Sequence, residues 1–387
     1  MIALTPNGGL TVIIQVTNRC QLDCPYCMAT KNDDDTPRVL VEKVIRFIDD
    51  KIPISRPVTI VWHGGEPLMM GVGFYRWVDE LQHSLTRDRG RIRNVFQTNG
   101  LLLTDEYLNF LEQVRDFTPN ISMDGPSVVT EQTRGVKAGA YDRLFKRLQS
   151  REIPFGVAVV ATEQVLKNKK EVIKYFEERN ILNVGIVPYH AFKRSDEEKV
   201  PTATFSINGS RLVKEHVTVH APLPPPSILA ELALEWPEAT SPGLKDVTLL
   251  GRALVRGIVS KNFQGDCLFS SFADGCHRYV LCIAVNGEIY PCPRGQNVGL
   301  WHYGNVDNGG LENWWGSTFG PAPFRPELPT ECSPCRHKSA CNGGCPANAL
   351  SMNGGRDKRD YYCESFIRLF DAAASIIDQE MSATSPA

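Results

Sequence analysis

The sequence has almost no net charge, and it has no long hydrophobic run. Its 387 residues include 42 basic and 44 acidic side chains, which leaves a formal net charge of −2. Such a balance provides no general attraction to nucleic acid or to an anionic membrane, and we expect neither as a partner. The N-terminus also lacks the basic and apolar regions of a secretory signal, and no apolar run approaches a membrane span. We therefore expect a cytoplasmic protein.

Cysteine is absent from the whole middle of the chain. Of the 12 cysteines, three precede residue 28, none lies between residues 28 and 266, and nine lie from 267 to 363. Cysteines in a cytoplasmic protein favour metal binding or catalysis over disulfides. Because the chain is also too long for one compact core, we predict two cysteine-bearing parts, residues 1–191 and 266–387, which residues 192–265 connect.

Strand-like and helix-like patterns alternate over the first half of the chain. This alternation predicts an α/β fold in which crossover helices connect parallel strands. Periodicity alone leaves open whether the sheet is open or closed. The predicted strands are Thr11–Val16, Val58–Trp62, Arg93–Gln97, Asn120–Met123, Phe155–Ala161 and Asn183–Pro188. The predicted helices are Val39–Asp50, Phe74–Leu85, Asp105–Phe117, Tyr141–Arg151 and Gln164–Arg179.

Three cysteines follow directly after the first predicted strand. Cys20, Cys24 and Cys27 have the spacing Cys-x3-Cys-x2-Cys on one short loop. Soft thiolates favour iron–sulfur clusters or zinc. A structural zinc ion requires four closed ligands, and no fourth ligand is near in the sequence, so zinc is the weaker alternative. Three thiolates can instead hold three irons of a [4Fe–4S] cluster and leave the fourth iron open.

Together with the aromatic Tyr26 before its third cysteine, this loop resembles the cluster loop of the radical S-adenosylmethionine (SAM) enzymes. The resemblance implies that SAM binds the open iron and that an electron cleaves SAM to methionine and a 5′-deoxyadenosyl radical, which removes hydrogen from a substrate. It also implies an electron donor such as flavodoxin or ferredoxin. The fold that it implies is a partial (β/α)6 barrel of the TIM type over roughly residues 8–190.

Ligands of such folds bind at the carboxyl ends of the strands. Gly64, Gly65 and Glu66 follow the second strand and resemble the family's GGEP motif, which contacts the SAM amino group; a carboxylate also suits a cationic ammonium. Ser122 and Arg134 are candidates for binding the SAM carboxylate, because an arginine can donate two hydrogen bonds to it. Asn99 is a candidate for binding the SAM ribose, and an asparagine after a strand also fits a plain turn. We regard strand-end histidines, His63 and His190, as ordinary polar groups. The expected SAM contacts are Tyr26, Gly64, Gly65, Glu66, Asn99, Ser122 and Arg134, and Asp124 is a candidate catalytic residue.

The C-terminal cysteines form a second pattern. Asn286-Gly287 predicts a hairpin turn that places Cys282 and Cys292 on its two arms. With Cys332-x2-Cys-x5-Cys-x3-Cys and a last cysteine, the segment resembles the SPASM domain. This resemblance implies two auxiliary [4Fe–4S] clusters, three in all; two zinc sites are the alternative, and Cys267 is left over. The implied ligand sets are Cys276, Cys282, Cys292 and Cys345 for the first cluster, and Cys332, Cys335, Cys341 and Cys363 for the second.

The connecting residues 192–265 are expected to be an insertion and a helical bridge. The strand-like runs Thr202–Ile207 and Arg211–Val219 flank Asn208-Gly209 and predict another hairpin, and Ser227–Glu235 and Val247–Lys261 predict helices. The insertion is either a structural elaboration or a sheet edge for an extended peptide.

We predict a radical SAM oxidoreductase that modifies a ribosomally synthesised peptide by crosslinking or oxidation. The alternatives are a dehydrogenase or rearrangement enzyme for a small metabolite, and an iron–sulfur electron carrier or scaffold. The aspartate that follows the hairpin cysteine in anaerobic sulfatase-maturing enzymes is Pro293 here, and Arg294 is a second candidate catalytic residue. Since only about ten residues precede the first strand, we expect no leader-binding domain, and a leader would be read by a separate protein or by the barrel and insertion.

Overall fold

The structure is a computed structural model. It describes residues 9–29, 31–85, 92–190, 201–208, 211–218, 223–235, 279–297, 299, 301–318 and 327–384. The predicted helix Val247–Lys261 and the cysteines Cys267 and Cys276 lie outside these residues.

Six parallel strands form the first part of the sheet, as the alternating pattern predicts. Each strand pairs with the next one along the chain, in the order β1-β2-β3-β4-β5-β6. The strands are β1 (Leu10–Thr17), β2 (Val58–Gly64), β3 (Ile92–Thr98), β4 (Phe117–Ser122), β5 (Gly156–Ala161) and β6 (Val184–Pro188). All eight residues of β1 are buried, because a parallel strand in the middle of a sheet is covered on both faces.

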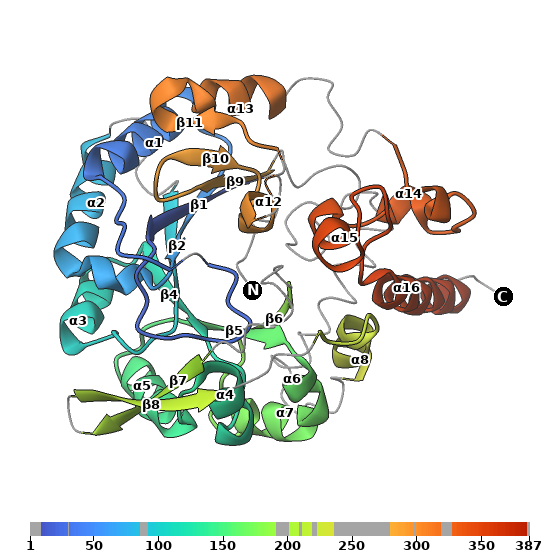
Figure 1. The fold of residues 1–387 in the computed structure, drawn as a ribbon, viewed down its shortest axis with the longest axis horizontal. Helices are drawn as coiled ribbons and strands as arrows, with labels where there is room; N and C mark the ends of the chain where they lie inside the picture. The colour runs from blue at the N-terminus through green and yellow to red at the C-terminus, as the bar shows by residue number, and fades with distance from the viewer. Residues whose placement is uncertain are drawn as a thin grey trace.

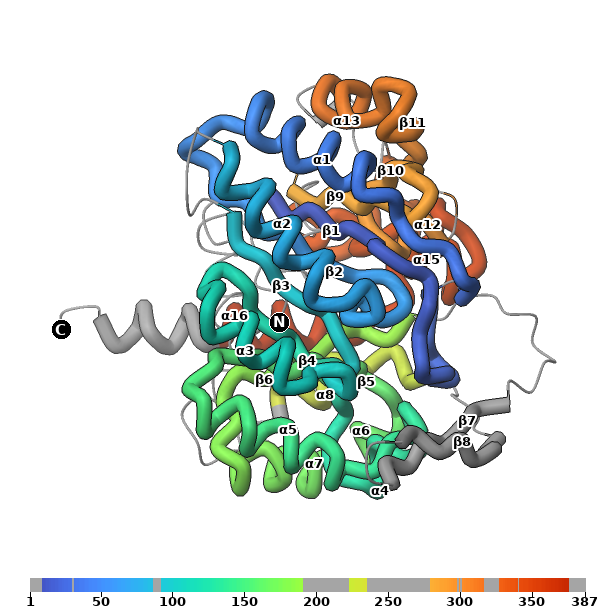
Figure 2. Tube along the Cα trace, turned by 90° about the vertical axis from the view of Figure 1, so that its left-hand side faces the viewer, coloured from blue at the N-terminus to red at the C-terminus, as the bar shows by residue number. Residues whose placement is uncertain are grey.

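The crossover helices lie on the outer side of this sheet, as Figure 1 shows. Seen from the side, α1, α2, α3, α5 and α7 follow one another down the molecule (Figure 2). The helices are α1 (Arg38–Lys51), η1 (Pro67–Met70), α2 (Val72–Ser84), α3 (Asp105–Gln113), α4 (Ser127–Arg134), α5 (Ala138–Ser150), α6 (Glu163–Lys167) and α7 (Lys169–Glu177). The partial barrel with outer helices that the resemblance implies is therefore confirmed.

The helices differ most from the sequence prediction in three places, apart from shifts of one to three residues at the other helix ends. The predicted helix Asp105–Phe117 ends at Gln113, and Phe117 already begins β4. The predicted helix Gln164–Arg179 is two helices, because Asn168 leaves the helical conformation at φ −112° and ψ 29° and separates α6 from α7. Helix α4 was not predicted; three of its eight residues are Thr and Ser, which are weak helix formers.

The predicted C-terminal hairpin is confirmed, and it joins the barrel sheet. Strands β9 (Val280–Ile283) and β10 (Glu288–Tyr290) pair antiparallel, and β9 also pairs parallel with β1. The short strand β11 (Gly304–Asn305) extends the sheet to nine strands, in the order β11-β10-β9-β1 and onward to β6. Cys282 lies on β9, whereas Cys292 lies two residues beyond the end of β10. The hairpin therefore continues the wall of the barrel.

Of the C-terminal helices, α15 (Pro346–Met352) and α16 (Cys363–Thr384) lie on the side of the molecule next to β6, whereas α13 (Gly310–Thr318) lies near α1 and β11 (Figure 1). The predicted helix Ser227–Glu235 is observed as α8 (Ile228–Glu235), and Ser365 of α16 binds to it through the backbone N–H of Ala230, at 3.3 Å. The remaining helices are α12 (Pro293–Asn297), η5 (Val306–Asn308), η6 (Thr330–Cys332) and α14 (Lys338–Cys341).

The predicted hairpin of the insertion is also observed. Strands β7 (Pro201–Asn208) and β8 (Arg211–Thr218) pair antiparallel over their whole length and form a separate two-stranded sheet. None of the described helices combines the length and apolar character that crossing a bilayer requires.

An aromatic cluster fills the space between the sheet and α2 and α3. Phe96 on β3 is fully buried, and its ring centroid lies 4.5 Å from that of Tyr75 and 5.4 Å from that of Phe117. Edge-to-face packing of this kind stabilises a core beyond the area that the rings bury.

We expect Phe96→Ala to lower the free energy of unfolding by about 3–5 kcal/mol, because the cavity it leaves cannot be refilled by rigid neighbouring rings. Urea denaturation of the purified protein measures the change. Val39→Ala is the matched control: Val39 is 59% exposed on α1, so its loss should change the free energy by less than about 0.5 kcal/mol. Equal effects of the two variants would contradict this view of the core.

Candidate active site

One cavity of about 340 Å³ connects the cluster loop with the C-terminal cysteines. From the first part of the chain it is lined by Cys20, Cys24, Tyr26, Cys27, His63, Gly64, Gly65, Asn99, Ser122 and Arg134, among others. From the C-terminal part it is lined by Cys292, Pro293, Arg294, Cys345, Asn348 and Asp360, among others. The structure thus places most of the predicted site residues on one cavity, including Arg294. Glu66 and Asp124 are not among the lining residues.

The cluster loop is ordered by its own backbone. Cys27 donates its N–H to the carbonyl of Cys24 at 3.0 Å, and Leu22 donates its N–H to Cys20 Sγ at 3.4 Å. Burial raises the pKa of the Cys20 thiol to about 11 and that of Cys24 to about 12. A metal must therefore displace the protons of these thiols in order to bind, and metal loading is expected to order the loop further.

Gly64 and Gly65 allow the end of β2 to lie directly against the backbone that leads into the cluster loop. A Cβ on Gly64 would lie 2.1 Å from the carbonyl oxygen of Thr17, and one on Gly65 would lie 2.2 Å from that of Arg19. Gly64 also has a φ of +132°, which other residues rarely adopt. Only glycine therefore allows this approach, which holds the two loops together below the cavity.

Glu66, the expected contact of the SAM ammonium, is not among the residues that line the cavity. Its carboxylate is fully buried and accepts hydrogen bonds from Thr98 Oγ1 at 2.6 Å and from the backbone N–H groups of Leu68 and Asn99 at 3.0 and 2.8 Å. Burial raises the pKa of Glu66, these three hydrogen bonds lower it, and the net result is a pKa raised to about 7. Glu66 thus connects the ends of β2 and β3 and acts on a ligand only through the backbone that it holds.

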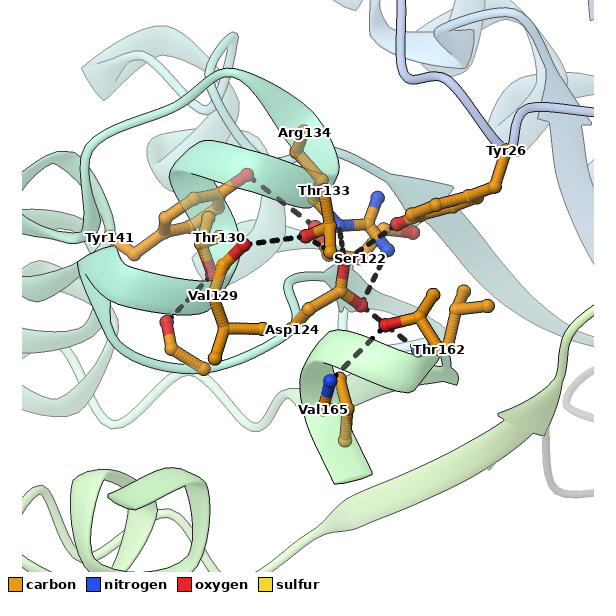
Figure 3. Close-up of polar contacts among 12 residues, drawn as sticks. Tyr26, Ser122, Asp124, Val129, Thr130, Thr133, Arg134, Tyr141, Thr162 and Val165 are labelled. Atoms are coloured by element: carbon orange, nitrogen blue, oxygen red, sulfur yellow. Dashed lines mark hydrogen bonds and ion pairs between the residues drawn. The ribbon is translucent and has the colours of Figure 1, made fainter. Parts of the chain in front are cut away.

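Asp124 is likewise buried, and Figure 3 shows it at the centre of a polar network. Its carboxylate accepts hydrogen bonds from Tyr26 Oη and Thr133 Oγ1, both at 2.7 Å, and from the backbone N–H of Val160 at 2.9 Å. Arg134 donates Nε and Nη2 to the two carboxylate oxygens at 2.9 and 3.1 Å. Since its oxygens are occupied by partners within the protein, Asp124 is placed to position other residues and not to contact a substrate.

Arg134 is therefore shared between the network and the cavity. Its side chain is 6% exposed, and two of its nitrogens bind Asp124 while its guanidinium carbon lies 5.3 Å from the centre of the Tyr26 ring. A fork to the SAM carboxylate, as predicted, would compete with Asp124. The hydroxyl of Ser122 accepts from Gln97 at 2.8 Å and keeps its own proton for a ligand. Asn99 directs Nδ2 toward Cys20 Sγ at 4.0 Å, while its Oδ1 accepts from Leu101 N–H, as in an Asx turn.

The auxiliary cysteines fall into two groups. Cys282 and Cys292 pack inside the barrel beside Ile13 and Val61. The backbone N–H of Cys345 donates to Asp360. Within the described residues, no three histidine, cysteine or acidic side chains converge closely enough for a single metal ion. A second cavity of about 60 Å³ is lined by the four cysteines of the other set, Cys332, Cys335, Cys341 and Cys363.

Several residues that line the main cavity belong to no motif that is recognisable in the sequence. Lys31 donates Nζ to the carbonyl of Leu22 at 2.7 Å and to Asp23 at 2.8 Å, and so braces the cluster loop. Asn348 and Asp360 approach the cavity from the C-terminal part. A positive charge close after the third cysteine was a possible signal for Lys31, but the other two are brought there by tertiary packing alone.

We expect Asp124→Asn to lower the free energy of unfolding by about 3–5 kcal/mol, because Arg134 would remain buried without its charged partner. Asp105→Asn is the matched control: this aspartate pairs with Arg147 and Arg151, its side chain is 72% exposed, and its loss should cost at most about 1 kcal/mol. Urea denaturation compares the two. A loss at Asp124 no larger than that at Asp105 would show that the network carries no stability.

Known proteins resemble this chain along most of its length. Residues 14–177 match the Radical SAM superfamily. A serine-type anaerobic sulfatase-maturating enzyme of Bacteroides thetaiotaomicron is 26% identical over 385 aligned residues, which cover 93% of this chain and 88% of that enzyme.

Two solved structures share the fold. The structure of anSMEcpe with bound AdoMet and Kp18Cys peptide superimposes with a TM-score of 0.72 at 18% identity, over 97% of this chain and 99% of that one. Streptococcus suis SuiB bound to the precursor peptide SuiA gives a TM-score of 0.61 at 18% identity, over 92% of this chain and 76% of SuiB. With the cysteine loop at the strand ends and the matching sequence region, residues 14–177 of this chain are a radical SAM domain.

Proposed function

We propose that this protein is a radical SAM enzyme with a SPASM-type C-terminal part, residues 266–387, that modifies a ribosomally synthesised peptide. The observation that carries the proposal is the single cavity that reaches from the three-cysteine loop to Cys292 and Cys345. A substrate in this cavity would lie between the SAM site and a second group of thiolates. A plain electron carrier needs no such enclosed space.

The expected cofactors suit the residues that line the cavity. Cys20, Cys24 and Cys27 would hold the SAM-binding cluster, because the three cysteines of this short loop all line the cavity. When bound, that cluster supplies the electron that cleaves SAM to a 5′-deoxyadenosyl radical. The chain itself would orient SAM through the backbone at Gly64 and Gly65 and through Ser122, and the apolar wall would exclude water.

Two of the cysteines expected to hold an auxiliary cluster, Cys292 and Cys345, line the same cavity. Because β10 runs antiparallel to β9, Cys292 lies toward the amino end of β1, whereas Cys20 follows its carboxyl end. An auxiliary cluster on Cys276, Cys282, Cys292 and Cys345 would thus be separated from the SAM cluster by the substrate space. This position suits acceptance of an electron from a substrate radical, and the set of four cysteines at the second cavity would pass it on.

A peptide is the substrate class that the comparisons favour. Two structures that share the fold contain peptides by their titles, Kp18Cys in one and SuiA in the other. Maturation of a sulfatase is less favoured, because Pro293 begins α12 where those enzymes are expected to have an aspartate. We propose a crosslink or an oxidation as the product, with flavodoxin or ferredoxin as electron donor and a separate protein as reader of any leader.

The anaerobically reconstituted protein should contain about twelve irons, from three four-iron clusters. Replacing Cys20, Cys24 and Cys27 together by alanine should leave about eight and abolish SAM cleavage. Replacing Cys332, Cys335, Cys341 and Cys363 should also leave about eight while the SAM-binding cluster remains. Iron analysis and electron paramagnetic resonance give the counts. A wild-type content near four irons, or bound zinc, would contradict the SPASM assignment.

Arg294 provides a test of where the substrate binds. It lines the cavity, and its charge lowers the pKa of His190. The reduced enzyme is incubated with SAM and a library of synthetic peptides, and mass spectrometry detects loss of hydrogen from a peptide. Arg294→Ala should slow this modification about 10-fold or more, while clusters and peptide-independent 5′-deoxyadenosine formation remain.

Arg336→Ala is the control, since Arg336 lies on the surface and pairs with Asp371. If wild-type enzyme forms 5′-deoxyadenosine but alters no peptide, the small-metabolite alternative replaces the peptide proposal. If Arg294→Ala modifies peptides at the wild-type rate, Arg294 makes no substrate contact.

A further inference from the structure

One buried histidine on the cavity wall has a ring nitrogen without a hydrogen-bond partner among the residues that the structure describes. His190 follows β6, lines the cavity, and is 5% exposed. Its Nδ1 lies 3.0 Å from Asn348 Oδ1, whereas Nε2 makes no hydrogen bond with any residue that the structure describes. Buried polar atoms in folded proteins are almost always paired, so an unpaired one on a cavity wall points to a ligand.

The neighbours of His190 determine which nitrogen carries the proton. The two oxygens of Asp360 accept backbone N–H groups, from Cys345 at 2.6 Å and from Tyr362 at 2.8 Å. The Asn348 group that faces this acceptor, at 3.3 Å, must be its NH2 donor, and its Oδ1 therefore faces the histidine. An amide oxygen only accepts, so Nδ1 of His190 is the protonated nitrogen.

It follows that Nε2 carries a lone pair. Burial, and then the charge of Arg294, lower the pKa of His190 to about 3, so the ring is neutral near pH 7. In a neutral imidazole with a protonated Nδ1, the other nitrogen is a hydrogen-bond acceptor. The ring of this cavity-lining residue therefore offers a hydrogen-bond acceptor and no further donor.

The same C-terminal segment also holds the backbone before the histidine. Tyr362 donates its hydroxyl to the carbonyl of Tyr189 at 2.5 Å. Asp360 fits because the neighbouring Gly344 has no side chain: a Cβ there would lie 2.5 Å from Asp360 Cβ. Two independent contacts thus fix the ring orientation and the backbone position of His190 before any ligand binds. Such an arrangement is preorganised for recognition.

We propose that Nε2 of His190 accepts a hydrogen bond from a donor group of the peptide substrate, either a backbone N–H or a side-chain O–H or S–H, and so fixes the substrate in the cavity. Asn348 and Asp360 act as positioning residues that hold the ring. This inference rests on the proposed function, because it assigns a contact within the same site.

The first test compares two replacements of His190 with the library peptide that the wild-type enzyme modifies best. His190→Phe keeps the ring volume and removes the acceptor, and it should lower kcat/KM about 10- to 100-fold. His190→Gln places an amide oxygen near Nε2 and should recover part of the loss. Iron content and peptide-independent 5′-deoxyadenosine formation should stay at the wild-type level in both.

A matched control and a positioning variant complete this test. His83→Phe alters an exposed histidine on α2 and should leave the rate unchanged. Asn348→Leu frees the ring to rotate and should cause a smaller loss than His190→Phe. If Phe is tolerated as well as Gln, the role of His190 is only to fill space. If peptide-independent SAM cleavage falls instead, the donor belongs to SAM. Either result overturns the proposal.

The two possible sources of the donor are separated by altering the peptide. Peptides methylated at one backbone nitrogen at a time remove single N–H donors, and Ser→Ala or Cys→Ala peptides remove side-chain donors. The change that removes the partner of His190 should slow the wild-type enzyme but should cost little further in His190→Phe. If every peptide change costs the same in both enzymes, the proposed hydrogen bond does not exist.

A spectroscopic readout tests the free nitrogen without a substrate. Nitrogen-15 NMR of histidine-labelled protein distinguishes a protonated ring nitrogen from an unprotonated one. At pH 7 the signals that His190→Phe removes should show a protonated Nδ1 and an unprotonated Nε2. Should wild-type enzyme modify no peptide, the proposed function fails, and these signals still decide whether His190 offers a free acceptor. A protonated Nε2 would contradict the assignment.

Discussion

The parallel pairing of β1 with both β2 and β9 is the constraint on which the site depends. Strand β1 is in register with Val58 onward on one side and with Val280 onward on the other. Parallel strands need a crossover between them, and here one crossover is α1 while the other includes most of the chain. This pairing brings Cys282, from the C-terminal part, into the interior of the barrel that begins with β1. Cys292, which packs beside Cys282, consequently lines the same cavity as the three cysteines of the cluster loop.

Two buried carboxylates, those of Glu66 and Asp124, accept hydrogen bonds from groups of the protein itself. Glu66 and Asp124 have almost every lone pair directed to backbone N–H groups, hydroxyls or Arg134. An isolated buried carboxylate would be very costly, so this saturation is what allows them to be there. Their effect is to hold loop ends: Glu66 connects the ends of β2 and β3, and Asp124 connects the cluster loop, through Tyr26, to β5 and α4.

Local patterns were reliable where burial and secondary structure are set by the same residues. All six barrel strands were predicted, since their apolar runs must be buried on both faces. The missed features depend on distant partners. Helix α4 has few strong helix formers, and Arg134 at its end is held by Asp124. The partners of Glu66 could not be predicted, because a carboxylate beside two glycines in the sequence does not reveal that it accepts hydrogen bonds from Thr98 and Asn99.

The sequence by itself determined the chemistry that the chain can carry. The spacing of Cys20, Cys24 and Cys27, the two glycines after β2, and the C-terminal cysteines define donor sets that local spacing is enough to specify. Only the tertiary structure decided which polar groups remain available to a ligand. Asn348 is 158 residues from His190 and 12 residues from Asp360 in the sequence, and no local pattern connects the three. Their hydrogen bonds leave Nε2 of His190 without a partner among the described residues, and the sequence cannot show this because the partners meet only when distant parts of the chain pack together.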